Sequence, residues 1–397
     1  MALATRYEFP PTPEIMACPW PAYAELRAER PVFQAAGGEF IISRHADIRE
    51  IMRQPEVFDN PSRTNHPKPN MLEIEGPAHK QRRLALSRLV SPRRMRDNEA
   101  MIRAQAEELI DGFIADGEVE FVMGFAVPFP AFIVPKMMGL EDHDTDWFLK
   151  WATGGLQGAA LNDVDDEAGA AHKSGWDYVY NYARKCLQER VDHPRDDLLT
   201  ELLDIQRREL GDIDLDALMA DVGVTIGGGV HTTSAMIANT MLLLLRDPEL
   251  LARAKAEPAM IPRLLEESLR LEAPVQWQPR TAVTDTEVAG TPIPAGSRLI
   301  LLFGSGNRDD EAFKCPAQFD ASRPDVTKHL SFGFGPHVCF GAPLARLEGK
   351  IAFETLLRRL DDLRLTDGED SVKLHLHPEH RTLDALDISF APAASAQ

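Results

Sequence analysis

Residues 332–341 constrain the fold of this chain more than any other part of its sequence. They read Phe-Gly-Phe-Gly-Pro-His-Val-Cys-Phe-Gly, and a helical pattern begins directly afterwards at Ala342. A thiolate just before a helix start is stabilised by the first-turn N–H groups and by the helix dipole. Gly335 and Gly341 lack a Cβ, so the backbone there can approach a bulky group or adopt a positive φ. The segment therefore predicts a loop that holds the sulfur of Cys339 on a large, flat cofactor.

Composition excludes several classes of function. The 397 residues carry a net charge of -19 with a pI near 5.1, which argues against nucleic acid and anionic membranes as partners. No apolar run approaches the ~20 residues of a membrane helix, and the first ten residues lack a signal-peptide core. We expect a cytoplasmic protein. None of the four cysteines lies in a C-x-x-C pair, so a zinc ribbon or a thioredoxin-type motif is not supported.

The longest predicted helix spans residues 214–246 and contains three consecutive glycines, 227–229. Each glycine costs about 1 kcal/mol relative to alanine inside a helix, so the triplet needs a reason. Close approach of a bulky group, or a local break in the hydrogen-bond ladder, would supply one. A hydroxyl at Thr232 can bond back to the carbonyl of Gly228.

The remaining pattern predicts a mainly α chain with a smaller β-rich part, near residues 31–60 and 276–303. Residues 31–34 and 39–43 resemble a hairpin, and residues 280–283 and 297–302 are rich in β-formers. Residues 127–151 read as a helix interrupted by prolines. Among the charged residues, His79 and Arg83 share one face of a helix at i and i+4, as do Glu267 and Arg270 at i and i+3.

The pattern Phe332-x-x-Gly335-x-His337-x-Cys339-x-Gly341 closely resembles the haem-binding loop of the cytochrome P450 family. The resemblance covers roughly residues 20–390 and rests on several ordered motifs. It implies the cytochrome P450 fold in a single domain, 1–397, with the haem between a long central helix and the Cys loop. A thiolate ligand pushes electron density onto iron and favours O–O cleavage.

The resemblance assigns roles to particular residues of this sequence. Cys339 would be the axial ligand of haem b and the metal-binding residue. Thr232 would be catalytic, in a groove that begins at Gly228. The implied haem-contacting residues are His79, Arg83, Gly228, Arg280, Phe332, His337, Cys339 and Gly341. The residues just before Arg280 would face the substrate: Val275, Trp277 and Gln278. Glu267, Arg270 and Arg323 would form a buried ion-pair network with a structural role.

His231 departs from the family pattern. It occupies the position of the usual acid beside Thr232. An imidazole can relay protons near neutral pH, so we treat His231 as a second catalytic candidate. A packing role for this histidine is the alternative.

The implied function is that of a monooxygenase that inserts one atom of dioxygen into a small apolar organic substrate. The chain has no flavin or iron–sulfur motif, so electrons would come from a ferredoxin and a ferredoxin reductase. Basic residues such as Arg82, Arg93, Arg94 or Arg346 would provide their docking surface.

Two other functions stay open. The first is a haem-thiolate enzyme that uses peroxide or a non-standard proton delivery, because His231 replaces the acid. The second is a non-catalytic haem sensor. The substrate cannot be deduced from the sequence.

The tail contains His375, His377 and His380 in the spacing His-x-His-x-x-His. Such spacing can indicate a metal site. Without a cysteine or an acid at fixed spacing, we interpret it as an exposed strand and turn.

Overall fold

The structure is a computed structural model that describes residues 7–61, 68–140, 167–211 and 213–393. Its contacts divide the chain into two compact units, each composed of several segments. The β-rich unit comprises Met1–Ser62, Ala259–Cys339 and Leu374–Leu383. The helical unit comprises Arg63–Pro258, Phe340–Lys373 and Asp384–Gln397. The expectation of a single domain, 1–397, stays a prediction.

The β-rich unit is built around one five-stranded sheet of order β1-β2-β8-β5-β3. Its strands are β1 (Val32–Gln34), β2 (Phe40–Ile42), β3 (Phe58–Asp59), β5 (Gln278–Ala282) and β8 (Arg298–Leu301), and a separate hairpin joins β6 (Thr286–Val288) to β7 (Thr291–Ile293). Its helices are α1 (Pro13–Ala17), α2 (Trp20–Glu29), α3 (His45–Met52), α12 (Ile261–Leu271) and α13 (Phe303–Gly306), with short 3-10 turns η5 (Val326–Lys328) and η6 (Gly335–His337). The predicted hairpin is confirmed, since Phe33 pairs with Ile41 in antiparallel register.

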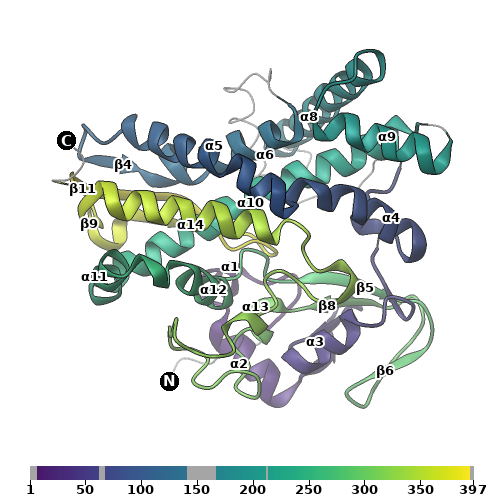
Figure 1. Cartoon of the computed structure of the whole chain (residues 1–397). Coiled ribbons are helices and arrows are strands. Elements are labelled where there is room, and N and C mark those ends of the chain that lie inside the picture. The colour runs from purple at the N-terminus through teal and green to yellow at the C-terminus, as the bar shows by residue number, and fades with distance from the viewer. Residues whose placement is uncertain (1–6, 62–67, 141–166, 212, 394–397) are drawn as a thin grey trace. The chain divides into compact units, whose positions relative to one another are not determined.

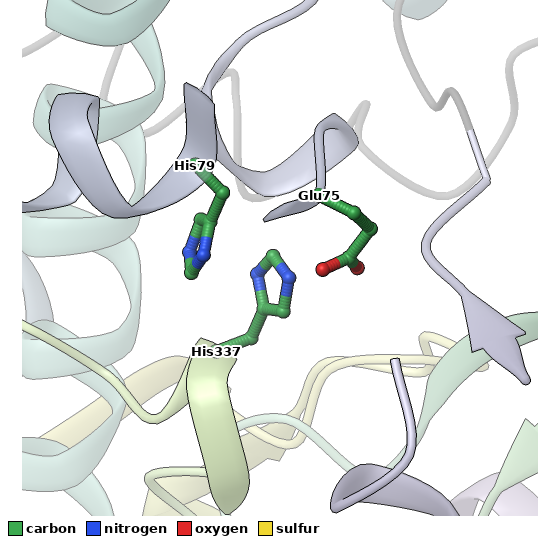
Figure 2. Close-up of side chains that lie close together, drawn as sticks. All are labelled: Glu75, His79 and His337. Carbon is green, nitrogen blue, oxygen red and sulfur yellow. The ribbon is translucent and has the colours of Figure 1, made fainter. Parts of the chain in front are cut away.

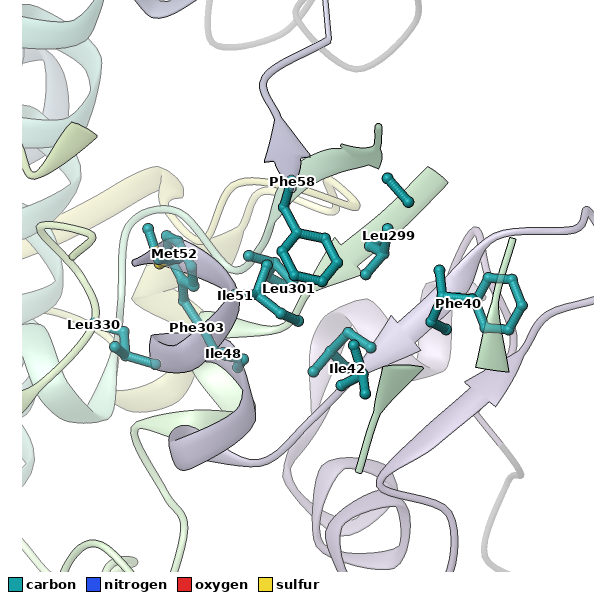
Figure 3. Close-up of a cluster of buried hydrophobic side chains, with 13 residues drawn as sticks. Phe40, Ile42, Ile48, Ile51, Met52, Phe58, Leu299, Leu301, Phe303 and Leu330 are labelled. Atoms are coloured by element: carbon teal, nitrogen blue, oxygen red, sulfur yellow. The ribbon is translucent and has the colours of Figure 1, made fainter. Parts of the chain in front are cut away.

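Both faces of this sheet are buried, because successive side chains of a strand point to opposite faces. On β8, Leu299 and Leu301 join a core with Phe40, Ile42 and residues of α3, as Figure 3 shows. Ile300, between them, belongs to a second core that contains Tyr23 and Leu26 of α2. The sheet therefore has a packed core on each face, and α13 follows directly after its strand β8.

The helical unit is centred on α10 (Leu215–Arg246), which packs against the helices α6, α8 and α14 (Figure 1). The other helices are α4 (Gly76–Leu86), α5 (Pro92–Asp111), α6 (Pro128–Met138), α8 (Glu167–Asp192), α9 (Leu198–Leu210), α11 (Pro248–Ala256) and α14 (Ala342–Arg359). Short turns are η1 (Met71–Glu73), η2 (Ser87–Val90), the π-helical η3 (Val122–Ala126) and η7 (Gly368–Ser371). A small sheet contains β4 (Glu118–Glu120), β9 (Leu360–Leu365), β10 (Val372–Leu374) and β11 (Leu383–Pro392).

Three sequence expectations need correction or restriction. The proline-rich segment is helical from Pro128 to Met138 with Pro135 inside the helix, and residues 141–151 lie outside the described part. The sheet of β4, β9, β10 and β11 lies outside the two β-rich stretches that the sequence predicted. The three glycines do not interrupt α10, which is helical throughout.

Candidate active site

The Cys loop of the β-rich unit is closed by its own backbone. The N–H of Cys339 donates to the carbonyl of Phe332 at 2.7 Å, and that of Val338 donates to Gly335 at 3.1 Å. These bonds satisfy backbone groups that a loop would otherwise leave to water. The Cys339 residue itself is exposed. The loop thus holds its shape while it presents the thiol.

Gly335 is required at its position by conformation and by packing. Its φ is +71°, in the left-handed region, and a Cβ there would lie 2.1 Å from the carbonyl oxygen of Met52 at the end of α3. Arg49 of α3 and Arg53, the residue that caps its C-terminus, hold their guanidinium groups 4.1 and 5.0 Å from the ring centroid of Phe334. The loop is therefore fixed against α3 by a backbone contact and by cation–π contacts.

Two basic candidates belong to the same unit. Arg280 lies on β5, is buried, and donates from Nη1 to the carbonyl of Pro279 at 2.6 Å. His337 lies in the single turn η6, two residues before Cys339. Phe332 has its ring 5.7 Å from that of His329.

The start of α4 carries the basic candidates of the helical unit. Figure 2 shows Glu75 and His79 projecting from this part of the chain. Glu75 is the N-cap residue in extended conformation, and Pro77 occupies the first turn, where its missing N–H costs nothing. His79 is buried and Arg83 half-buried, one turn apart on the same helix.

Arg82 forms an ion pair within the helical unit, and its proposed part in docking stays a prediction. Its guanidinium forms a bidentate pair with Asp221 of α10, at 2.7 and 2.6 Å, and also donates to the carbonyls of Pro69 and Ala217. The N–H of Met71 donates to the same carboxylate. Arg94 likewise pairs with Glu201.

One face of α10 is open in an otherwise buried helix. Val224, Gly228, His231 and Thr232 are exposed or half-exposed, whereas most of their neighbours are buried. Val224, Gly228 and Thr232 lie four residues apart, and His231 lies three residues after Gly228, which places the four on one side of a helix. The Thr232 hydroxyl donates to the carbonyl of Gly228 at 2.5 Å, as the sequence predicted.

The glycine triplet serves two purposes. A Cβ at Gly229 would come within 3.0 Å of the Val134 side chain of α6, so this glycine lets two helices approach closely. At Gly228 a Cβ would meet no described atom within 4 Å. Close approach therefore explains Gly229, and Gly228 leaves room beside the open face.

Glu348 was missed in the sequence. It lies in α14 and is fully buried, and among the described residues no Lys or Arg pairs with its carboxylate. Burial raises the pKa of Glu348 well above its usual range, and the hydroxyl of Thr233 on α10 partly opposes this shift. Its position four residues after Leu344 and three before Ile351, in the apolar stripe of the helix, was the available signal.

The ion-pair network has the composition that the sequence predicted. Glu267 accepts from Arg270 Nε at 2.7 Å and Nη2 at 2.8 Å, from Arg323 Nε at 3.0 Å, and from the N–H of Asp320 at 2.9 Å. The side chains of Glu267 and Arg270 are 0% exposed. Arg270 also donates to the carbonyls of Asn307 and Pro316. The network joins α12 to the segment between α13 and η5.

The predicted substrate-facing residues contact the turn that follows β10. Val275 forms an isolated antiparallel bridge with His380. The buried Trp277 donates from Nε1 to the carbonyl of Pro378 at 2.7 Å, and Gln278 donates from Nε2 to Glu379 at 3.2 Å.

The expectation of an exposed histidine turn is wrong for His377, which is 4% exposed. Its Nδ1 accepts the backbone N–H groups of Glu379 and His380, at 3.0 and 2.9 Å. The imidazole therefore stabilises the turn, and the His-x-His-x-x-His spacing reflects local structure.

Comparison with known proteins identifies the family. The family model described as Cytochrome P450 matches residues 161–379. The chain is 34% identical over 379 residues to a Steroid C26-monooxygenase of Mycobacterium tuberculosis, covering 94% of each chain. It is 29% identical to the Vitamin D(3) 25-hydroxylase of Pseudonocardia autotrophica, with 95% of each covered.

Solved structures agree. Cytochrome P450 CYP109Q5 from Chondromyces apiculatus superposes with a TM-score of 0.87 at 28% identity, over 99% of this chain and 100% of that one. CYP109E1 from Bacillus megaterium in complex with testosterone gives a TM-score of 0.86 at 25% identity, over 95% and 99%. The chain belongs to the cytochrome P450 family, has its mainly α fold, and is an oxidoreductase of the monooxygenase type.

The residues present fit a thiolate-ligated haem. An exposed thiol stands on a loop whose backbone is already closed, and the same unit supplies Arg280 and His337. In the helical unit, Gly228 leaves space beside Thr232. In the part of the chain that the structure describes, no helix is both long and apolar enough to cross a membrane.

Proposed function

We propose that this protein is a haem b monooxygenase that hydroxylates an apolar organic substrate of the steroid type. The exposed Cys339, on a loop closed by its own backbone in a chain of the cytochrome P450 family, carries the proposal. When bound, the haem supplies the activation of dioxygen, favoured by a thiolate ligand. The first-turn N–H groups of α14 favour the ionised form of this sulfur.

Within the β-rich unit, Arg280 and His337 are the candidates for binding a haem propionate, and within the helical unit the candidates are His79 and Arg83. Charge-assisted hydrogen bonds to carboxylates are short and strong. Burial of Arg280 and His79 strengthens such bonds, because the local dielectric is low. The haem ring would contact Phe332, Gly228 and Gly341. The two glycines have no side chain, so they would let the ring approach the backbone closely.

Thr232 would hold the proton that the reaction consumes. Its hydroxyl hydrogen points to the carbonyl of Gly228, so its oxygen lone pairs remain available to accept a second hydrogen bond. His231, half-exposed on the same helical face, is one candidate source of that proton. Glu348, which lies beside Thr233 and whose pKa is raised by burial, is another.

The relatives support an apolar, polycyclic substrate. Two of them are named for hydroxylation of a steroid or of vitamin D(3), and a structural neighbour was solved with testosterone. The half-buried Val275 and Gln278 would contribute an apolar contact and one polar amide. Trp277, between them, packs in the second core of the β-rich unit with its ring 5.3 Å from that of Phe9, so it would support this segment from behind. Such pockets place a few polar groups to orient an apolar ligand.

Electrons would come from a separate ferredoxin and its reductase. Arg93, whose side chain is 87% exposed and pairs with Asp97 one turn away, and the exposed Arg346 are the more accessible docking candidates. Arg82 and Arg94 are less accessible, because their side chains are 20% and 23% exposed in ion pairs with Asp221 and Glu201. A cytoplasmic location stays a prediction.

Binding and turnover test the proposal together. Testosterone and a fatty acid of similar carbon number would be titrated while the Soret band is recorded, and turnover would be followed with ferredoxin, reductase and NADPH. We expect a Soret shift with the steroid and one hydroxylated product. Thr232→Ala should keep the shift but divert NADPH consumption from product to peroxide. Equal coupling in both proteins would contradict the role of Thr232.

The departure at His231 motivates a second candidate function, a peroxide-driven oxygenase. Product yield with hydrogen peroxide would then exceed the yield with the electron-transfer proteins. If His231 limits proton delivery, His231→Asp should raise the fraction of consumed NADPH that yields hydroxylated product with the redox partners. A haem sensor would instead show no substrate-stimulated NADPH oxidation with any reductase pair.

A further inference from the structure

The turn at residues 377–380 is held by a side chain where most turns use backbone. Nδ1 of His377 accepts from the N–H groups of both Glu379 and His380. A ring nitrogen that accepts carries no proton, so the neutral imidazole has its hydrogen on Nε2. His377 is almost fully buried, and this arrangement requires the neutral ring.

This turn fixes three consecutive residues, Gln276 and the two predicted substrate-facing residues Trp277 and Gln278. The N–H of Gln276 donates to the carbonyl of Glu379 at 2.7 Å. Trp277 Nε1 donates to the carbonyl of Pro378, and Gln278 Nε2 donates to the carboxylate of Glu379. Every one of these bonds ends on the two residues that follow His377.

We propose that His377 is a positioning residue for the substrate, and that its protonation releases Trp277 and Gln278 from the turn. The inference rests on the proposed function, because it takes Gln278 as a substrate contact and Trp277, packed in the second core, as a support of the same segment. Protonated Nδ1 is a donor, so it would face two N–H donors and both bonds would be lost. The turn is then intact near neutral pH and opens as the pH falls.

The charged groups around the ring determine where that change occurs. The rings of His375 and His380 lie with centroids 5.6 and 4.7 Å from that of His377, so each disfavours a second imidazolium. Arg381 adds a positive charge, which its ion pair with Glu272 offsets. Glu379 would attract an imidazolium, but its carboxylate is engaged by Gln278. Tyr23 and Gln276 line the same hollow as the three imidazoles and carry no charge at neutral pH.

Three substitutions separate the acceptor from the proton. His377→Asn places an amide oxygen near the position of Nδ1, where it can accept both N–H groups but does not titrate. His377→Leu keeps the bulk and removes the acceptor. His375→Asn is the matched control, since it removes a neighbouring imidazole that accepts neither of these two N–H groups.

The readout is hydrogen exchange of the Gln276, Glu379 and His380 amides in the purified holoprotein, corrected for intrinsic rates, from pH 8 to 5. In the natural protein and in His375→Asn, we expect protection to fall about tenfold as histidine titrates, the value for one to two hydrogen bonds. His377→Asn should stay protected throughout. His377→Leu should lose protection about tenfold at pH 8 already. A similar pH response in the natural protein and His377→Asn would overturn the inference, as would unchanged protection in His377→Leu.

Testosterone affinity, from the Soret shift at pH 8, tests the link to the substrate. We expect His377→Leu to bind about tenfold more weakly and His377→Asn to bind as the natural protein does. Equal affinity in all three proteins would overturn the positioning role. A natural protein that shows no shift with any apolar ligand would count against the proposed function, while the exchange results would still decide the role of His377 in the turn.

Discussion

The network around Glu267 and the loop of Cys339 belong to the same unit but treat their polar groups in opposite ways. Both carboxylate oxygens of Glu267 are bonded, and its side chain is fully buried. Cys339 is exposed, and the loop around it is closed by bonds of its own backbone. A buried charge must be fully compensated to be tolerated. A ligand to a cofactor must instead be held in place with its reactive atom accessible.

Structural and functional motifs differ in how accessible their polar atoms are. Glu-x-x-Arg and Cys-x-Gly are both short and polar, and either could be assigned to chemistry from the sequence. The structural motif has each partner within one network, whereas the functional motif has a rigid backbone around an accessible atom.

The largest expected effect on stability comes from breaking the buried network. Glu267→Gln leaves two buried guanidinium groups without their carboxylate, which costs about 3–5 kcal/mol. Urea unfolding of the holoprotein measures this loss. The control is Arg93→Ala, which removes the exposed pair with Asp97 and should change the unfolding free energy by less than about 0.5 kcal/mol. Equal losses of unfolding free energy in the two variants would show that the buried network contributes no more than an exposed ion pair.

A smaller effect tests the rigidity of the Cys loop. Gly335→Ala adds a Cβ at positive φ and against the carbonyl of Met52, so it should destabilise by about 1–3 kcal/mol and reduce haem retention. Gly333→Ala is the matched control, because its φ is +70° but the nearest atom to a Cβ is 3.5 Å away. Haem retention after gel filtration compares the two. A loop equally tolerant of both changes would not be fixed by α3.

The smallest expected effect on stability concerns the buried carboxyl group of Glu348. Its raised pKa means that the folded state binds a proton more tightly than the unfolded state. The resulting stabilisation is present below the unfolded pKa and is lost as the pH rises towards the folded value. Glu348→Gln should therefore stabilise the protein more at pH 8 than at pH 5, as measured by thermal unfolding. A difference between variant and natural protein that does not change with pH would exclude a titrating Glu348.

Much of the fold was predictable because strong local signals set it. The periodic apolar pattern and the proline at its end predicted α10 almost to the residue, and the Gly37-Gly38 turn predicted the β1–β2 hairpin. The ion-pair network was predictable only through family resemblance, since Glu267 and Arg323 lie far apart in the sequence.

The rest depends on tertiary packing that no local pattern records. The position of Glu348 in the apolar stripe of α14 indicates burial, but only the packed structure shows that Thr233 of α10 lies beside its carboxyl group. His377 looks like a surface histidine until two backbone N–H groups turn towards its ring. The need for glycine at position 335 arises from Met52, in a helix almost three hundred residues earlier.

Cys339 is proposed as the thiolate ligand of a haem, and the absorption spectrum of the reduced protein with carbon monoxide is the direct test of this assignment. We predict a red-shifted Soret band typical of thiolate ligation in the natural protein and in Cys18→Ser, which alters another exposed cysteine. Cys339→Ser should lose that band. A natural protein whose reduced carbon monoxide complex has the spectrum of a histidine-ligated haem, or a Cys339→Ser variant that keeps the thiolate band, would contradict the account.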